Sequence, residues 1–207
     1  MSFSPPVPRV PGGRAEHPRE ARILEAAIDV FWERGFAGGS VQRIAARAAI
    51  PKASIYHVFA AKDEVLFEIF DRSHANALEI MAEAASLDGG PLDKLRDYLF
   101  RFVVYYLEHP KIVGLYYRER RVLTGEWEEQ LARQRREYDR FVGDLIRAAR
   151  EQGEIPRSID PRLATFFVIG AINGIADWHP PVPAVSPEEF AAVWVDIALG
   201  SIDPPAA

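Results

Sequence analysis

The stretch SVQRIAARAAIPKASIYHVFAAKDEVL, residues 40–66, holds the strongest local structural signals in the chain. Ser40 stands directly before an apolar pattern of helical period and can cap a short helix over Val41–Ala48. Ala48-Ala49-Ile50 then makes a tight connection to a second short helix over Pro51–Phe59, where proline suits the first turn. Two such helices form a helix-turn-helix, whose second helix can enter the major groove of DNA.

The two sides of the predicted helix over residues 51–59 differ in chemistry. At about 100° per residue, the apolar side chains of Ile55, Val58 and Phe59 share one side. The opposite arc, about 140° wide, carries a cation, a methyl group and two hydrogen-bonding rings. These four residues are Lys52, Ala53, Tyr56 and His57. A lysine and a tyrosine can hold phosphates, and a small residue lets the helix lie close to the bases.

Helical periodicity continues on both sides of this stretch. A helix over residues 19–35 carries an apolar stripe, and Gly35 followed by Phe36 predicts its end. An alanine-rich helix is expected over residues 62–85. Further helices are expected over 92–107, from Pro110 onward, and over 126–152, 161–178 and 187–202. About nine helices and no strand predict an all-α fold.

The charge is distributed unevenly. The net charge is −5, yet residues 1–62 hold nine Lys/Arg against five Asp/Glu, and the remainder holds 16 against 25. A locally basic end is typical of nucleic-acid binding, although a charge run alone is more often a solvated surface. Residues 1–18 contain five prolines and predict a disordered arm. Arg9 and Arg14 in this arm could touch phosphates, although an inert tail is the simpler interpretation.

Several function classes find no support in the residues. The absence of cysteine excludes disulfides, thiolate zinc sites and cysteine nucleophiles. There is no nucleophile elbow, phosphate-binding glycine loop or HExxH motif, and the five histidines are too scattered for a metal site. We therefore expect no enzyme, cofactor or metal, with a helical enzyme using Glu119 or Asp177 as the alternative. No signal peptide and no apolar stretch of membrane-spanning length is found, which favours the cytoplasm.

Residues 22–66 resemble the N-terminal domain of TetR-type transcriptional regulators in spacing, core pattern and turn. The motifs that carry the resemblance are Arg22-Ile-Leu-Glu-Ala-Ala, Arg34-Gly35-Phe36, Ser40-Val41, Ile44-Ala45, Lys52-Ala53-Ser54-Ile55-Tyr56-His57 and Lys62-Asp63. The resemblance implies that family members touch DNA at the positions of Ser40, Gln42, Lys52, Ser54, Tyr56, His57 and Lys62, and Ala53 joins them from its helix face. It divides the chain into a DNA-binding domain, 19–66, and a ligand-binding and dimerisation domain, 67–207.

This sequence departs from the family pattern at the turn. Ala49 stands where a glycine is common, at a cost of roughly 1 kcal/mol if the left-handed conformation is kept. Pro51 replaces the usual serine cap, so that the cap hydrogen bond is lost. Ala53 replaces a frequent glycine and changes how closely the helix can approach the groove. The fold is therefore expected, while the operator sequence stays open.

Aromatic residues are plentiful in the second domain and could line an apolar cavity, although single aromatics at helical spacing are more often plain core. The candidate ligand-binding residues are Phe102, Tyr105, Tyr106, Tyr116, Tyr117, Trp127, Phe141, Phe167, Asn173 and Trp178. The region from His109 to Trp178 is also similar to a TetR-type subgroup that controls lipid, steroid or aromatic-acid catabolism and often responds to acyl-CoA. Arginines such as Arg118, Arg120, Arg121 and Arg133 could meet CoA phosphates, or form solvated ion pairs.

The last two predicted helices, over 161–178 and 187–202, are rich in apolar residues. A helix without a polar face is buried on both sides. The resemblance implies that these two helices pair with their symmetry mates in a homodimer. The resemblance implies a repressor released from a palindromic DNA operator by a small-molecule effector. A DNA-binding protein without a ligand remains an alternative.

Overall fold

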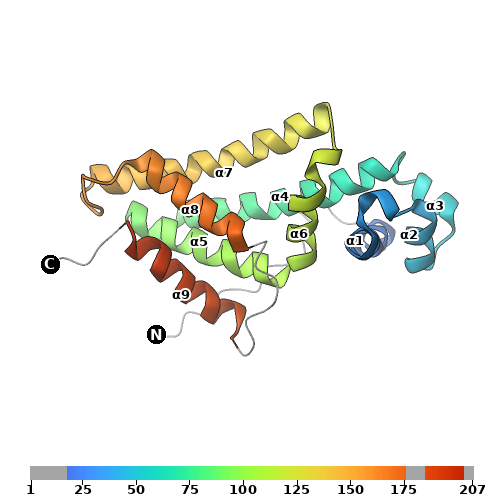
Figure 1. Cartoon of the computed structure of the whole chain (residues 1–207), viewed down its shortest axis with the longest axis horizontal. Coiled ribbons are helices and arrows are strands. Elements are labelled where there is room, and N and C mark those ends of the chain that lie inside the picture. The colour runs from blue at the N-terminus through green and yellow to red at the C-terminus, as the bar shows by residue number, and fades with distance from the viewer. Residues whose placement is uncertain (1–17, 176–184, 203–207) are drawn as a thin grey trace. The chain divides into compact units, whose positions relative to one another are not determined.

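The computed structural model describes residues 18–175 and 185–202, and every regular element in these two ranges is a helix (Figure 1). The all-α prediction is confirmed. The predicted arm, Pro18 excepted, lies outside the described residues, as do Asp177 and Trp178. None of the described helices is both long and apolar enough to cross a membrane. The chain divides into two compact units, residues 1–76 and 77–207.

The first unit is built around a short helix pair. Its elements are α1 (Pro18–Gly38), α2 (Val41–Arg47), α3 (Lys52–Tyr56) and the first part of α4 (Lys62–Ser86). The regular part of α1 ends where the sequence predicts, because Gly35 has a φ of 68° that L residues avoid. Phe36 then returns onto Phe31, with ring centroids 5.2 Å apart. The core of the unit includes Ile23, Ala27, Phe31, Ile44, Ile55, Leu66 and Phe70.

The turn between α2 and α3 has the predicted left-handed residue. Ala49 has a φ of 53°, the one positive φ at a non-glycine among the described residues. This conformation lets the Ile50 amide donate to the Ala45 carbonyl at 3.1 Å. Pro51 precedes α3 in an extended conformation without a side-chain cap. The helix ends at Tyr56, earlier than the predicted Phe59, because the two amides that follow His57 turn back onto one carbonyl, that of Ile55.

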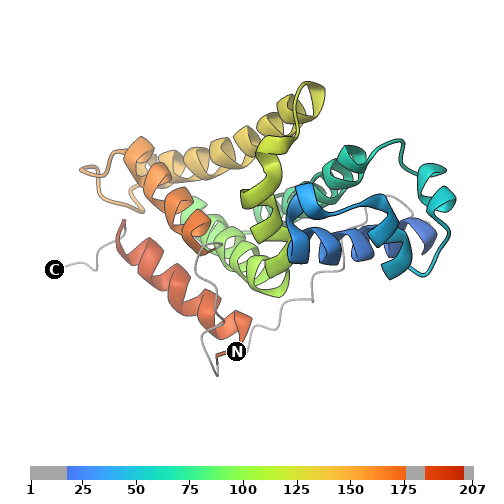
Figure 2. The same cartoon turned by 45° about the vertical axis from the view of Figure 1, so that its right-hand side comes forward.

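The second unit contains the remainder of α4 and five further α-helices. These are α5 (Pro91–Glu108), α6 (Pro110–Glu119), α7 (Glu126–Glu151), α8 (Pro161–Ile175) and α9 (Pro187–Gly200), with a 3₁₀ turn, η1 (Arg120–Val122). Helix α9 lies along α5 and α8 lies along α7, as both views show (Figures 1 and 2). The core between them includes Tyr98, Leu99, Phe102, Val142, Ile146, Val168, Val195 and Leu199.

Candidate functional site

Helix α3 presents the polar face that its sequence predicts. Ile55 is buried at 1% exposure, whereas Lys52, Ala53, Tyr56 and His57 are all exposed. Tyr56 is 49% exposed, and the Lys52 Nζ lies 5.7 Å from the centroid of its ring. A cation and a ring in this arrangement support one another on a surface that is otherwise solvated. The face therefore offers a charge, a methyl group and two polar rings on less than two turns of helix.

The flanking candidates lie in different environments. Gln42 is exposed on α2, and Ser54 is half-buried on α3. The Ser40 Oγ accepts a hydrogen bond from the Arg43 amide at 3.3 Å, which confirms the prediction that Ser40 caps α2. Lys62 is half-buried, and its Nζ donates to two backbone carbonyls within the unit. The structure thus exposes five of the eight candidates around α2 and α3, leaves Ser40, Ser54 and Lys62 half-buried, and directs the Lys62 ammonium to backbone carbonyls.

Two arginines fasten α2 to α1. The Arg22 guanidinium donates to the Ala48 carbonyl at 2.7 Å and so satisfies the C-terminal end of α2. Arg47 pairs with Glu33 at 2.6 Å and with Asp29 at 3.1 Å, both on α1. Exposed ion pairs contribute little free energy, but two acids on one arginine fix its orientation. These contacts set the position from which α3 projects.

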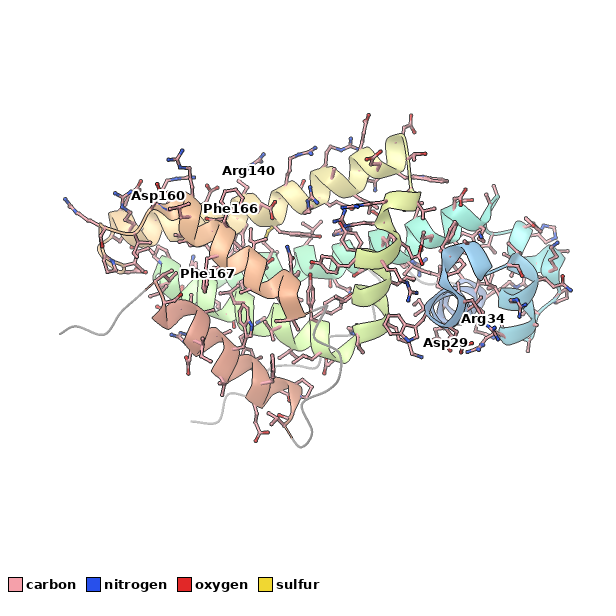
Figure 3. All side chains as sticks on the ribbon, viewed as in Figure 1. Asp29, Arg34, Arg140, Asp160, Phe166 and Phe167 are labelled. Atoms are coloured by element: carbon pink, nitrogen blue, oxygen red, sulfur yellow. The ribbon has the colours of Figure 1, made fainter. Side chains whose placement is uncertain are left out.

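The sequence reasoning missed one exposed cation near this face. Arg43 lies in the first turn of α2, next to Gln42, and forms no ion pair with any described residue. The sequence could have indicated that Arg43 is exposed, because its helical position lies on the side of α2 opposite the buried Val41 and Ile44. Arg34, at the end of α1, is similarly exposed (Figure 3).

Several of the aromatic candidates meet in the core of the second unit. Phe102 lies 4.7 Å from Tyr106 and 6.2 Å from Tyr138, centroid to centroid. Phe141 packs edge-on against Tyr98 at 5.2 Å. Tyr98 was missing from the sequence-based set, although it lies one turn before Phe102 on the same helix face. Helices α5 and α7 together thus build an aromatic cluster.

A chain of polar atoms runs through the edge of this cluster. The Tyr106 hydroxyl on α5 lies 3.3 Å from the Tyr117 hydroxyl on α6, which donates to the Asn173 Oδ1 on α8 at 2.5 Å. Tyr116 packs edge-on against Tyr117 at 5.6 Å. Burial raises the pKa of Tyr106 and of Tyr117, so that both hydroxyls stay protonated and can donate. Three helices are therefore joined by one chain of polar atoms that ends at the exposed Asn173.

Of the remaining candidates, Tyr105 lies in the same core, whereas Trp127 and Phe167 lie outside it. Tyr105 is fully buried and packs on His109, with centroids 4.6 Å apart. Trp127 is half-buried in the first turn of α7. Phe167 is 50% exposed on the outer side of α8. The structure therefore gathers Phe102, Tyr106, Tyr116, Tyr117, Phe141 and Asn173, places Tyr105 in the same core, and separates Trp127 and Phe167 from them.

Helices α8 and α9 expose apolar side chains to solvent. Phe166 is 76% exposed beside Phe167 on α8, where Figure 3 labels both. Leu163 is 69% exposed one turn earlier, and the spacing of the three residues defines a stripe. On α9, Val193 and Ile197 are 61% and 69% exposed at i, i+4 spacing. We call these five residues the apolar face.

Comparison with known proteins identifies the family. A family model described as "Bacterial regulatory proteins, tetR family" matches residues 23–69. A second model, "Tetracyclin repressor-like, C-terminal domain", matches residues 88–202, which is more than half of the chain. The two matches correspond to the helix-turn-helix unit and to the helices from α5 to α9.

Individual proteins are similar over most of their length. The HTH-type transcriptional repressor SCO4008 of Streptomyces coelicolor is 28% identical over 165 residues, which cover 79% of each chain. The repressor KstR2 of Mycobacterium tuberculosis is 25% identical over 190 residues, 89% of this chain and 92% of its own. The crystal structure of AibR in complex with isovaleryl coenzyme A and operator DNA superposes with a TM-score of 0.78 and 27% identity, covering 91% of this chain and 100% of AibR.

The predicted DNA-binding helix-turn-helix and the resemblance are both confirmed by these matches, and the helical-enzyme alternative is removed. The chain belongs to the tetR family of bacterial regulatory proteins and is a DNA-binding transcriptional regulator, not an enzyme.

Proposed function

We propose that this regulator is a homodimeric repressor that binds a palindromic operator through α3 and leaves it when an acyl-CoA-type effector binds among α5, α6, α7 and α8. The observation that carries the proposal is the exposed face of α3 above a fully buried Ile55. We assign residues 19–66 to DNA binding and residues 67–207 to effector binding and dimerisation.

On the DNA, each residue of the face has a role that suits its chemistry. Lys52 and Tyr56 hold phosphates, His57 donates a hydrogen bond, and the Ala53 methyl group lets the helix approach the base edges. Gln42 and Ser54 lie beside this face and can reach bases or backbone. Ser40 orients α2 through its cap. Arg43 adds a phosphate contact at the same edge.

Dimerisation supplies the second recognition helix, which a palindromic operator with two half-sites requires. The apolar face on α8 and α9 consists of five large side chains that stay half or more exposed in a single chain. Large apolar side chains exposed at helical spacing on α8 and again on α9 favour an association site. A two-fold symmetric dimer uses the same patch on both subunits and places two recognition helices at symmetric half-sites. Phe167 belongs to this face in the proposal, and not to the effector site.

The effector site is assigned to the aromatic cluster and its polar chain. Aromatic rings with a few convergent polar groups are typical of small-molecule sites. Phe102 and Phe141 would pack against an acyl chain, and the Tyr117 hydroxyl would turn its single O–H from Asn173 to a thioester carbonyl. The similarity to AibR, which was crystallised with isovaleryl coenzyme A and operator DNA, supports this class of effector. Ligand binding then shifts the dimer between two states of different operator affinity.

A gel-shift experiment with DNA from upstream of the protein's own gene tests the DNA part. We expect a sequence-preferring complex that weakens steeply as salt rises. Lys52→Ala and Tyr56→Ala should weaken the complex while the dimer, measured by sedimentation, stays intact. The proposal fails if neither this DNA nor other candidate operators form a salt-sensitive, sequence-preferring complex.

Loss of the shifted band on addition of a candidate effector tests the effector part of the proposal. Isovaleryl-CoA should dissociate the complex, and free CoA serves as the control without an acyl group. Tyr117→Phe keeps the ring but removes the hydroxyl, so that about tenfold more thioester should be needed, as expected for one lost hydrogen bond. Operator binding by this variant should be unchanged. If a panel of thioesters and apolar compounds releases nothing, the alternative of a DNA-binding protein without an effector is favoured.

A further inference from the structure

The ammonium group of Lys62 is already coordinated within the first unit. Its Nζ donates to the Phe36 carbonyl at 2.7 Å and to the Gly39 carbonyl at 3.0 Å. It also lies 4.0 Å from the centroid of the Phe36 ring. A lysine has three N–H donors, so two point at carbonyls and a ring face occupies a further side. Little of this cation is left to meet a DNA phosphate.

The two carbonyls belong to the place where the chain leaves α1 and enters α2. Phe36 follows Gly35, whose φ of 68° interrupts α1, and its ring is anchored on Phe31. Gly39 packs so closely on that Phe31 ring that an added Cβ would come within 2.6 Å of it. A cation at a helix C-terminus stabilises the unpaired carbonyls there. Lys62 thus adds two hydrogen bonds to a turn that the Gly39 amide closes by donating to the Gly35 and Phe36 carbonyls.

The location of Lys62 in the chain gives this contact a consequence for α3. Lys62 is the first residue of α4, while Gly39 directly precedes Ser40, the cap of α2. Helix α3 lies between α2 and α4 in the sequence, so one ammonium ties together the elements on both sides of it. Farther along α4, Arg72 pairs with Glu20 near the start of α1 and with Glu68. The first part of α4 is therefore fastened to α1 at two separated points.

We propose that Lys62 is a positioning residue that sets the recognition helix, and that it is not a phosphate contact. By holding the start of α4 on the end of α1, it fixes α3 relative to the rest of the helix-turn-helix. The inference rests on the proposed DNA-binding role of α3, and it reassigns one residue that the family resemblance places at the DNA.

The dependence of operator affinity on salt separates the two roles. A lysine that neutralises a phosphate contributes about one to the slope of log K against log salt, in each protomer. We compare Lys62→Met with Lys52→Met in the full-length dimer, because each removes one positive charge and keeps an apolar stem. Lys52→Met should flatten the slope by about one per protomer. Lys62→Met should weaken operator binding about tenfold or more at every salt concentration and leave the slope unchanged.

Amide hydrogen exchange supplies a readout that needs no DNA. In Lys62→Met the amides of residues 40–57 should exchange at least about tenfold faster, because α2 and α3 lose their anchor. Lys52→Met should leave them unchanged. If wild-type protein binds no operator, the proposed function fails, while this measurement still tests the role of Lys62.

Lys62→Gln covers the case in which the methionine variant does not fold. Glutamine is neutral but can still donate to a carbonyl, so positioning predicts an unchanged slope and an affinity between those of wild type and Lys62→Met. The inference is overturned if either Lys62 variant flattens the slope as Lys52→Met does. It is equally overturned if operator affinity and exchange over residues 40–57 both stay at wild-type values.

Discussion

At the scale of single residues, Ala49 adopts a backbone conformation that is unfavourable for a residue with a Cβ atom. Its φ of 53° lies in the left-handed region, where a Cβ costs about 1–2 kcal/mol. The contact that requires this turn is the hydrogen bond from the Ile50 amide to the Ala45 carbonyl. The strain is tolerated because buried neighbours such as Ile44 and Ile55 hold both helices in place.

Ala49→Gly should therefore stabilise the protein by roughly 0.5–1 kcal/mol, since glycine adopts this φ without strain. Urea unfolding followed by circular dichroism measures the change. Ala46→Gly, at an exposed position inside α2, is the matched control and should cost about 0.5–1 kcal/mol. If both glycines destabilise to the same extent, the turn is not strained.

The buried tyrosines make the second unit sensitive to base. Burial raises the pKa of Tyr98, Tyr106 and Tyr138 above the ordinary value near 10. Below about pH 10 both the folded and unfolded chains keep these protons, so the stabilisation is fully present. Above that pH the unfolded chain loses protons that the folded chain retains, and the free energy of unfolding falls.

Tyrosinate absorbance and helical circular dichroism, recorded together against pH, check this prediction. The urea-unfolded chain should ionise its tyrosines near pH 10, whereas the folded chain should ionise the buried ones only as its helices melt. Ionisation of all tyrosines near pH 10 with the helices intact would falsify the assignment of these hydroxyls to the core.

At the scale of elements, α5 depends on a cap from a distant loop. The Glu154 carboxylate, between α7 and α8, accepts a hydrogen bond from the Leu92 amide at 2.7 Å in the first turn of α5. Gly90, at the N-cap position, has no side chain for this purpose. A carboxylate at a helix N-terminus pairs with a free amide and with the positive end of the helix dipole.

Glu154→Ala should lower the free energy of unfolding by about 1–2 kcal/mol, since it leaves a half-buried amide without its partner. Glu151→Ala, an exposed residue at the end of α7, serves as control and should change the stability by less than about 0.5 kcal/mol. Equal effects of the two substitutions in urea unfolding would show that the cap contributes nothing specific.

At the scale of the whole molecule, the apolar face should decide the oligomeric state. Phe166 is 76% exposed in one chain, and burying a phenylalanine contributes about 1.5–3 kcal/mol. Phe166→Asp acts on both sides of a symmetric interface, so the dimer should dissociate at least about a hundredfold more readily. Operator affinity should fall with it, because a single recognition helix reads only one half-site.

Sedimentation equilibrium measures the dissociation constant, and the gel shift measures the operator affinity. Val122→Asp is the matched control, because Val122 is 44% exposed in η1, outside the apolar face. It should leave the dimer intact. A dimer that survives Phe166→Asp unchanged argues for a different interface.

Much of this protein was determined by local sequence. Gly35 with Phe36 marks the end of the regular part of α1, and Ser40 caps α2 as predicted. The exposed side of α3 followed from the angular positions of its residues, because a helix fixes which side chains share a face. These features depend on residues within a turn or two of one another, so the sequence contains their full physical cause.

Tertiary packing alone decided how the distant residues pair. Lys62 meets the Phe36 carbonyl across 26 positions, and Tyr117 meets Asn173 across 56. Nothing in the sequence around Lys62 distinguishes a cation that caps a helix from one that faces a phosphate. A phenylalanine such as Phe167 is likewise expected in the core from its residue type, yet it faces outward on α8. Such contacts depend on how whole helices pack, because each helix orients its side chains only relative to its own axis.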